Sequence, residues 1–341
     1  MKTFISIFQR TGKWKFFAGV DIRKVPAYSV VFFPIQPYHL FCGFAGVLAI
    51  KRGVSPAVAE PVDELDRQFQ EIKEKDISLL LSDALSSVEY LNGTHALEEI
   101  AKSAFRLKED TSFQNIFFQP EKIRSLSSLL NSMKDFFSKE EKALEEKANR
   151  FPSSDMEIIN SKHVLLKDII WSIEKDILEN IAKIVQLSGL DQTDAITPEA
   201  LKKYKNLNFV LNNLDRLEVR GRDSAGIQIS FTLRDNESME SVIKSLIDKG
   251  LYDDFQKRAL PKDMANGAIL MPSFPCNGRH TLSFVYKISS IIGELGHNVR
   301  ELRKYIAADK IFHEISNAEA VFQISLGHTR WASVGSITDE N

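Results

Sequence analysis

The stretch Leu326-Gly-His-Thr-Arg-Trp-Ala-Ser-Val-Gly335 lies near the end of a chain of 341 residues. The apolar residues that alternate through positions 321–326 lead into it and predict a half-buried strand. Arg330 then offers a planar guanidinium that can bind a carboxylate through two parallel hydrogen bonds. Trp331 adds an aromatic wall and an N–H donor. The alternative is a strand end with an ordinary surface arginine, so this stretch alone assigns no function.

Composition limits the class of protein. The chain has 44 Lys+Arg against 46 Asp+Glu and a net charge of -2, which argues against a dedicated nucleic-acid-binding protein. No apolar run approaches the ~20 residues that a membrane-spanning helix needs. The two cysteines, Cys42 and Cys276, make no disulfide framework, so a reducing, cytoplasmic setting is expected. Because CxxC and HExxH patterns are absent from the sequence, we predict neither a metal site nor a cofactor.

A second stretch, Cys42-Gly-Phe-Ala-Gly-Val-Leu-Ala-Ile50, has the apolar character of a strand. Its two internal glycines allow other groups to approach the backbone closely. A thiol is the most nucleophilic side chain at neutral pH when a base lies nearby, which makes Cys42 a candidate nucleophile. The alternative is a buried structural cysteine, the commoner role of an unpaired cysteine.

The third stretch is Arg216-Leu-Glu-Val-Arg-Gly-Arg-Asp-Ser-Ala-Gly-Ile227. Residues 221–226 are rich in small and polar side chains, as expected where the backbone must approach a ligand or another strand. The alternating residues 227–233 predict a strand directly after this turn. An ordinary connection between a helix and a strand would have the same composition, so the alternative stays open.

Helical periodicity dominates the rest of the chain. Residues 62–206 predict a helical insertion in which Pro120 lies in the first turn of a helix and His163 lies on a helix surface. Residues 236–320 predict a second, mostly helical insertion that includes an amphipathic helix over residues 288–302. Together with three strands, these helices predict an α+β fold. The three strands are expected at residues 42–50, 227–233 and 321–328.

Taken in order, the three stretches resemble the motifs of the N-terminal-nucleophile glutamine amidotransferases. Within that family the Leu-Glu-x-Arg-Gly-x-Asp-Ser-Ala-Gly and His-Thr-Arg-Trp-Ala runs are most similar to the glutamine–fructose-6-phosphate aminotransferases. The resemblance covers residues 42–50, 207–233 and 321–341. It implies part of a glutaminase domain with the αββα sandwich of the N-terminal-nucleophile hydrolases, interrupted by two helical insertions.

The resemblance assigns Cys42 as the nucleophile that attacks the side-chain amide of glutamine and releases ammonia. In this family the base is the α-amine of the cysteine itself, whose reference pKa of about 8 lies close to neutral pH. That amine is bonded to Phe41 in the sequence as written. Residues 1–41 are therefore expected to be a leader or a miscalled start, and the mature chain to begin at Cys42.

The resemblance also assigns the binding and supporting residues. Glutamine is expected to contact Arg330, Trp331 and Ser333. The nucleophile is expected to be supported by Arg220, Gly221 and Asp223. The implied partners are glutamine and, through sugar-phosphate domains beyond Asn341, fructose 6-phosphate, with a homodimer possible. Two alternatives stay open: another glutamine amidotransferase of the same fold, and an incomplete glutaminase core that serves only as a helical interaction module.

Overall fold

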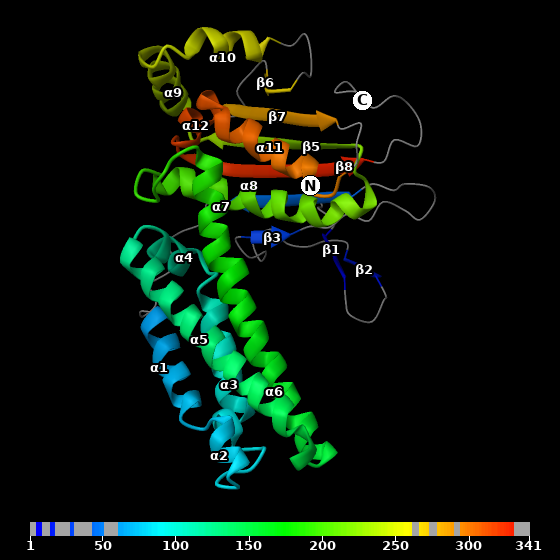
Figure 1. The fold of residues 1–341 in the computed structure, drawn as a ribbon. Helices are drawn as coiled ribbons and strands as arrows, with labels where there is room; N and C mark the ends of the chain where they lie inside the picture. The colour runs from blue at the N-terminus through cyan, green and yellow to red at the C-terminus, as the bar shows by residue number, and fades with distance from the viewer. Residues whose placement is uncertain are drawn as a thin grey trace. The chain divides into compact units, whose positions relative to one another are not determined.

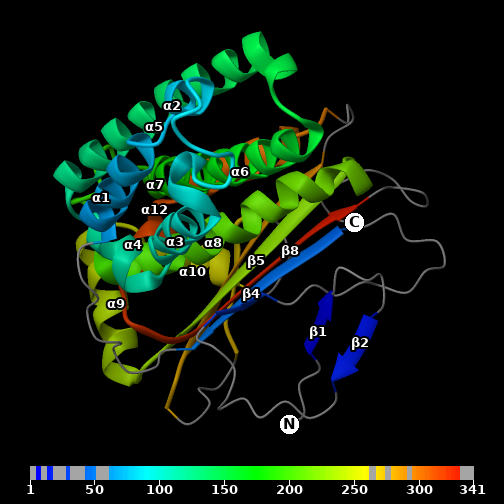
Figure 2. The ribbon, with the colours of Figure 1, turned by 90° about the horizontal axis from the view of Figure 1, so that it is seen from below.

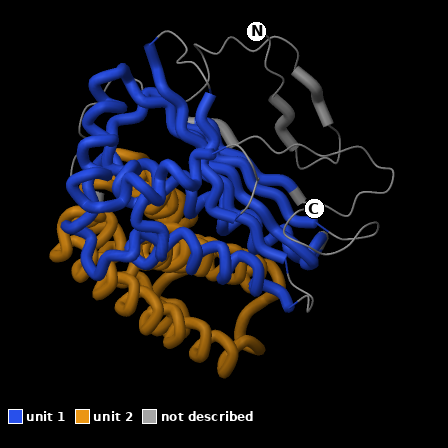
Figure 3. Tube along the Cα trace, turned by 90° about the horizontal axis from the view of Figure 1, so that it is seen from above, with its two compact units in different colours: residues 1–53, 184–341 blue, residues 54–183 orange. Residues whose placement is uncertain are grey.

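The computed structural model describes residues 5–8, 14–17, 28–30, 43–50, 61–260, 266–272, 278–289 and 294–330. The chain forms two compact units, which Figure 3 distinguishes by colour. Unit 1 contains residues 1–53 and 184–341, and unit 2 contains residues 54–183. The second boundary falls inside helix α7 (Glu179–Ser188), so residues 184–206, expected in the first helical insertion, cluster with unit 1.

Unit 1 is built on an antiparallel sheet (Figure 1). Its strands, in spatial order, are β3 (Tyr28–Val30), β4 (Gly43–Ile50), β8 (Ala320–Arg330), β5 (Ser224–Leu233), β7 (Thr281–Ser289) and β6 (Ala268–Leu270). The first two strands of the chain, β1 (Ile5–Phe8) and β2 (Trp14–Phe17), pair separately. The three strands expected from the sequence are present as β4, β5 and β8, and the α+β class is confirmed. The described residues form this sheet and the β1–β2 pair, and they do not show an αββα sandwich.

One face of the sheet is covered by α8 (Pro198–Leu217), which lies along β4 and β8 (Figure 2). The glycine of the Leu-Gly-His run explains how closely the helix approaches. A Cβ on Gly327 would lie 2.7 Å from Leu214 Cδ1 and 3.0 Å from Val210 Cγ1, so any larger residue would push α8 away. On β8 this face is formed by buried residues: Gln323, Ser325, Gly327 and Thr329.

The other helices of unit 1 come from residues 236–320. They are α9 (Asn236–Asp248), α10 (Tyr252–Ala259), α11 (His297–Ala308) and α12 (Lys310–Ser316). Phe312 of α12 is fully buried and packs edge-on against Phe284 and Tyr286 of β7, with ring centroids 5.1 and 6.1 Å away. These aromatic contacts join α12 to the sheet.

The expectation of a mostly helical stretch at residues 236–320 misses two strands. β7 pairs with β5 along nine residues, and β6 pairs with β7, so this part of the chain extends the sheet. The helix expected over residues 288–302 is wrong at its start, because Ile288 lies in β7 and α11 begins only at His297. Residues 281–289 alternate between the two faces of the sheet, which places Leu282, Phe284 and Tyr286 in the core.

Every described element of unit 2 is helical, as the sequence predicts. The α-helices are α1 (Pro61–Lys73), α2 (Ile77–Leu81), α3 (Gly93–Arg106), α4 (Asp110–Phe117), α5 (Pro120–Lys147) and α6 (Ser153–Trp171). Two 3-10 turns, η2 (Tyr90–Asn92) and η3 (Ala148–Arg150), and a π-helical segment, η4 (Ser172–Leu178), complete it. Pro120 occupies the first turn of α5. Backbone N–H groups in the first turn have no partner within the helix, so the N–H that proline lacks costs no helical hydrogen bond. None of the described helices is long and apolar enough to cross a membrane.

Candidate functional site

The sheet brings the ends of the three sequence stretches together. β8 lies between β4 and β5 and is antiparallel to both, so the start of β4, the end of β8 and the start of β5 share one end of the sheet. Gly43 lies opposite Thr329, and Ser224 lies opposite Arg330. The N–H of Asp223 donates to the carbonyl of Arg330 over 3.1 Å, which continues the ladder beyond the strand end. Segments that are about a hundred residues or more apart in sequence thus meet at neighbouring positions.

The candidate residues are described to different extents. Cys42, Trp331 and Ser333 lie outside the described residues, although Gly43 follows Cys42 directly and Arg330 precedes Trp331. The backbone of Arg220 belongs to the 3-10 turn η5 (Glu218–Arg220). Gly221 is buried, and Asp223 and Arg330 are partly exposed. The structure therefore places the described supporting residues and the arginine at one end of the sheet.

The face of the sheet opposite α8 carries positive charge beside Arg330. Strand alternation puts His328 and Arg330 on this face, since Thr329 between them is buried under α8. His328, Gly226 and Lys287 form one row across three strands. Partial desolvation lowers the pKa of His328, whose side chain is exposed, and the charges of Lys287 and Arg330 lower it further. Lys287 and Arg330 make this part of the face cationic and suited to a carboxylate.

The glycine of the Asp-Ser-Ala-Gly run has a specific role in this row. A Cβ on Gly226 would lie 3.1 Å from Nε2 of His328, tighter than ordinary van der Waals contact. Glycine here lets the imidazole lie across β5. The sequence predicted that the backbone of this turn is approached closely, and the structure identifies His328 as the group that approaches it.

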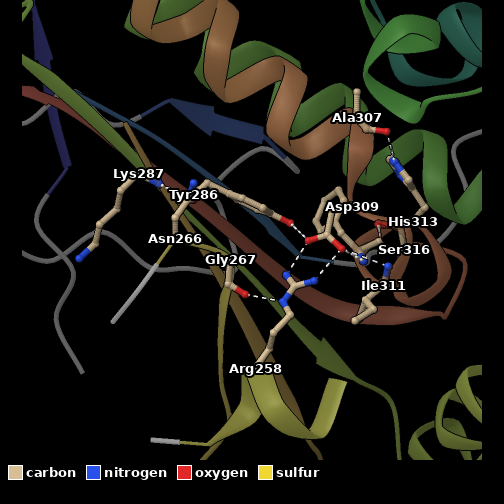
Figure 4. Close-up of polar contacts among 11 residues, drawn as sticks. Arg258, Asn266, Gly267, Tyr286, Lys287, Ala307, Asp309, Ile311, His313 and Ser316 are labelled. Atoms are coloured by element: carbon tan, nitrogen blue, oxygen red, sulfur yellow. Dashed lines mark hydrogen bonds and ion pairs between the residues drawn. The ribbon is translucent and has the colours of Figure 1, made fainter. Parts of the chain in front are cut away.

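A second polar cluster in unit 1 has a structural role (Figure 4). Arg258 of α10 donates to the Asp309 carboxylate from its two terminal nitrogens, Nη1 and Nη2, over 2.8 and 2.5 Å. Its Nε donates to the carbonyl of Gly267 over 2.6 Å. The hydroxyl of Tyr286 donates to the same carboxylate over 2.7 Å. The Arg258 guanidinium holds the pKa of the Asp309 carboxyl below its usual range despite burial.

A cavity of about 560 Å³ lies beside this cluster, lined in part by Lys257, Lys310 and Tyr305. The Asp309 carboxylate also accepts the N–H groups of Ile311 and Phe312, each over 3.0 Å, and so caps α12. With five hydrogen bonds the carboxylate is saturated. Its role is to join α10, β7 and α12 rather than to bind a ligand.

Unit 2 contains a third cluster that the sequence did not reveal. The hydroxyl of Tyr90 donates to Glu140 over 2.7 Å and lies 2.8 Å from Nε2 of His163. The N–H of Ile77 donates to the same oxygen of Glu140 over 2.7 Å. The expectation that His163 lies on a helix surface is wrong, because it is buried with a partner 73 residues away. This network connects α2, η2, α5 and α6 through the core of unit 2.

Among the described residues, no cluster of three or more His, Cys, Asp or Glu side chains could hold a metal ion. Comparison of the chain with protein-family models, with curated proteins and with solved structures finds no match. The functional assignment therefore depends on the motifs and on the geometry of unit 1.

Proposed function

We propose that unit 1 is part of the glutaminase domain of an N-terminal-nucleophile amidotransferase that makes glucosamine 6-phosphate from glutamine and fructose 6-phosphate. One observation carries the proposal: the register of β4, β8 and β5 brings the three motif ends to one end of the sheet. A chance occurrence of three motifs in order would not require them to meet in space. The cationic face around Arg330 and Lys287 adds support, because the substrate presents a carboxylate.

In the proposed reaction, Sγ of Cys42 forms a bond to the side-chain amide carbon of glutamine. The free α-amine of Cys42 accepts the thiol proton and passes it to the departing nitrogen, so the C–N bond breaks and ammonia leaves. Water then hydrolyses the thioester, which releases glutamate and restores the thiol. The amine can act only when residues 1–41 are absent, so the active protein begins at Cys42.

The remaining assignments concern binding. Arg330 holds the α-carboxylate of glutamine, and Trp331 and Ser333 line its pocket. Arg220 and Gly221 lie beside the nucleophile, and Asp223 supports their turn through its hydrogen bond to Arg330. In the αββα sandwich implied by the family, the sheet of unit 1 would be one of the two sheets, and α8 would belong to its outer helical layer. Ammonia would then react with fructose 6-phosphate on a separate sugar-phosphate domain.

The test is covalent labelling of the purified full-length gene product with a diazo ketone analogue of glutamine, followed by intact mass and peptide mapping. We expect one adduct per chain, located on an N-terminal Cys42. The adduct should disappear in Cys42→Ala and persist in Cys276→Ala, the matched control for the other cysteine. An active protein that retains residues 1–41, or a protein that is never labelled at Cys42, would contradict the proposal.

The acceptor is tested separately, because another amidotransferase would share the same nucleophile. We expect that fructose 6-phosphate increases the rate of glutamine consumption and that glucosamine 6-phosphate accumulates. Labelling at Cys42 without either effect would support an amidotransferase with a different acceptor.

A further inference from the structure

The turn between α8 and β5 is attached to the N-terminus of α11 by a buried carboxylate. Glu218 is 0% exposed, and its Oε1 accepts the N–H of Val299 over 2.9 Å. Its Oε2 accepts the N–H of Gly296, the residue before the helix. The first N–H groups of a helix have no partners within it, and the helix dipole favours negative charge at this end. Glu218 thus supplies a cap from a residue 78 positions away from Gly296.

A second side chain of α11 reaches the far end of the same turn. Asn298 is 0% exposed, and its Nδ2 donates to the carbonyl of Arg222 over 2.8 Å. Its Oδ1 has no hydrogen-bond partner among the described residues. An unpaired buried acceptor is unfavourable, so an apolar side chain of similar shape would be expected here if Asn298 served packing alone. Its bond to the Arg222 carbonyl gives the amide a specific role.

The opposite side of the turn is bound to β8. The hydroxyl of Thr329 donates to the carbonyl of Leu217 over 3.3 Å, and the N–H of Asp223 donates to the carbonyl of Arg330 over 3.1 Å. The turn is therefore fixed on one side by α11 and on the other by β8. Between these fixed points lie Arg220 and Gly221.

We propose that Glu218 and Asn298 are positioning residues that hold the turn at residues 220–223, and through Asp223 the backbone of Arg330, in the geometry that binds glutamine. The identity of the substrate rests on the proposed function, but the mechanical role of the two side chains does not. It follows that α11, which comes from the stretch expected to be an insertion, is part of the scaffold of the site.

Hydrogen exchange tests the mechanical role directly. Glu218→Gln keeps the shape of the side chain but replaces one acceptor oxygen by an NH2 group, so only one of the N–H groups of Gly296 and Val299 keeps its partner. Asp235→Asn is the matched control, because Asp235 caps α9 in the same unit, accepts the N–H of Ser238 over 2.9 Å, and lies outside the turn.

We expect exchange at residues 217–224 and in the first turn of α11 to become about tenfold faster or more in Glu218→Gln and to stay unchanged in Asp235→Asn. Asn298→Ala, which keeps the Glu218 cap, provides the same test should Glu218→Gln fail to fold. Unchanged protection of the turn in the folded variants, or an equal loss in Asp235→Asn, would overturn the positioning role.

Steady-state kinetics then separates positioning from lost stability. Loosening the backbone of Arg330 weakens substrate binding, so Glu218→Gln should raise KM for glutamine about fivefold or more with a smaller change in kcat. A variant that merely contained less folded protein would lower the apparent kcat and leave KM unchanged. KM should stay within about twofold in Asp235→Asn, and an unchanged KM in Glu218→Gln would contradict the inference. If the parent protein hydrolyses no glutamine, the proposed function fails, while the exchange result still decides the positioning role.

Discussion

Units 1 and 2 each bury a lysine whose ammonium group donates to three backbone carbonyls. In unit 1, Lys203 donates to Glu199, Ser316 and Ala318 over 3.2, 2.9 and 2.6 Å. In unit 2, Lys162 donates to Ser87, Val88 and Tyr90 over 2.8, 2.7 and 2.7 Å. Burial lowers the pKa of each lysine to about 8. Lys203 thus joins the first turn of α8 to the end of α12, and Lys162 joins α6 to residues 87–90.

The surroundings of the two lysines differ. Next to Lys203, the buried amides of Asn206 and Gln323 bond to each other over 3.0 Å, and neither group titrates. Next to Lys162 lies the network of Tyr90, Glu140 and His163, in which the carboxylic acid and the imidazole both titrate. A buried lysine thus lies beside amides that do not titrate in unit 1 and beside a network that titrates in unit 2.

The largest loss of stability is expected when either buried lysine is replaced. Lys203→Met and Lys162→Met keep an unbranched apolar side chain but leave three carbonyls without their donor, at a cost of about 3–5 kcal/mol in the free energy of unfolding. Denaturant unfolding, with hydrogen exchange to locate the loss in the mutated unit, measures both. A loss below about 1 kcal/mol in one variant would show that water replaces that ammonium group.

The second largest effect is a change in the stability of unit 2 with pH. Burial raises the pKa of Glu140 to about 7, although its hydrogen bonds to Tyr90 and Ile77 oppose the shift. Between pH 4.5 and 7 the folded state binds the proton more tightly than the unfolded state, so the stability of unit 2 should fall as pH rises. The fall should reach about 3 kcal/mol. The lysines stay charged in both states over this range and do not contribute.

The pKa shift of His163 changes the stability of unit 2 with pH in the opposite direction. Burial lowers its pKa, so its contribution is present above pH 6.5 and is lost as pH falls below that value. The shift of Glu140 is the larger, so a net fall in stability with rising pH is expected. Exchange of α5 amides, corrected for the intrinsic rate at each pH, measures it. Glu140→Gln should flatten the dependence, and an equally steep dependence in that variant would identify another group.

The hydrogen-bonded side-chain amides of Asn206 and Gln323 in unit 1 provide the comparison for the titratable network of unit 2. Gln323→Leu leaves Nδ2 of Asn206 buried without its acceptor, which should cost about 1–3 kcal/mol. Because no titratable group is involved, this cost should be the same at pH 5 and pH 8 in denaturant unfolding. A cost that changed with pH would mean that Lys203, whose carbonyl accepts from Gln323 over 3.3 Å, changes its protonation when the amide is removed.

Local sequence patterns predicted much of unit 1 and the helical nature of unit 2. Apolar alternation predicted β5 and β8, and the apolar character of residues 42–50 predicted β4. Pro120 predicted the start of α5. β7 was missed although Leu282, Phe284 and Tyr286 recur at every second position. The isoleucines that follow it suggested a helix, and the strand was absorbed into that pattern.

The missed polar contacts have a different cause. Tyr90 lies 50 residues from Glu140 and 73 from His163, and Gly296 lies 78 residues from Glu218. No local pattern distinguishes a carboxylate that caps a distant helix from one on a solvated face. The register of β4, β8 and β5 is also a long-range property, so the spacing of the motifs could not predict that they meet, and only the family resemblance implied it.

The smallest loss of stability is expected when a helix cap is removed, and each unit offers one cap for comparison. Thr197 caps α8 in unit 1 by accepting the N–H of Ala200 over 3.2 Å, and Asp76 caps α2 in unit 2 by accepting those of Ser78 and Leu79. Replacing either by alanine should cost about 1 kcal/mol in the free energy of unfolding. The loss in Asp76→Ala should be the larger of the two, because Asp76 accepts two N–H groups of its helix and Thr197 accepts one. Urea unfolding of the two variants measures this difference. An equal cost in both variants would show that the second hydrogen bond of Asp76 adds nothing to stability.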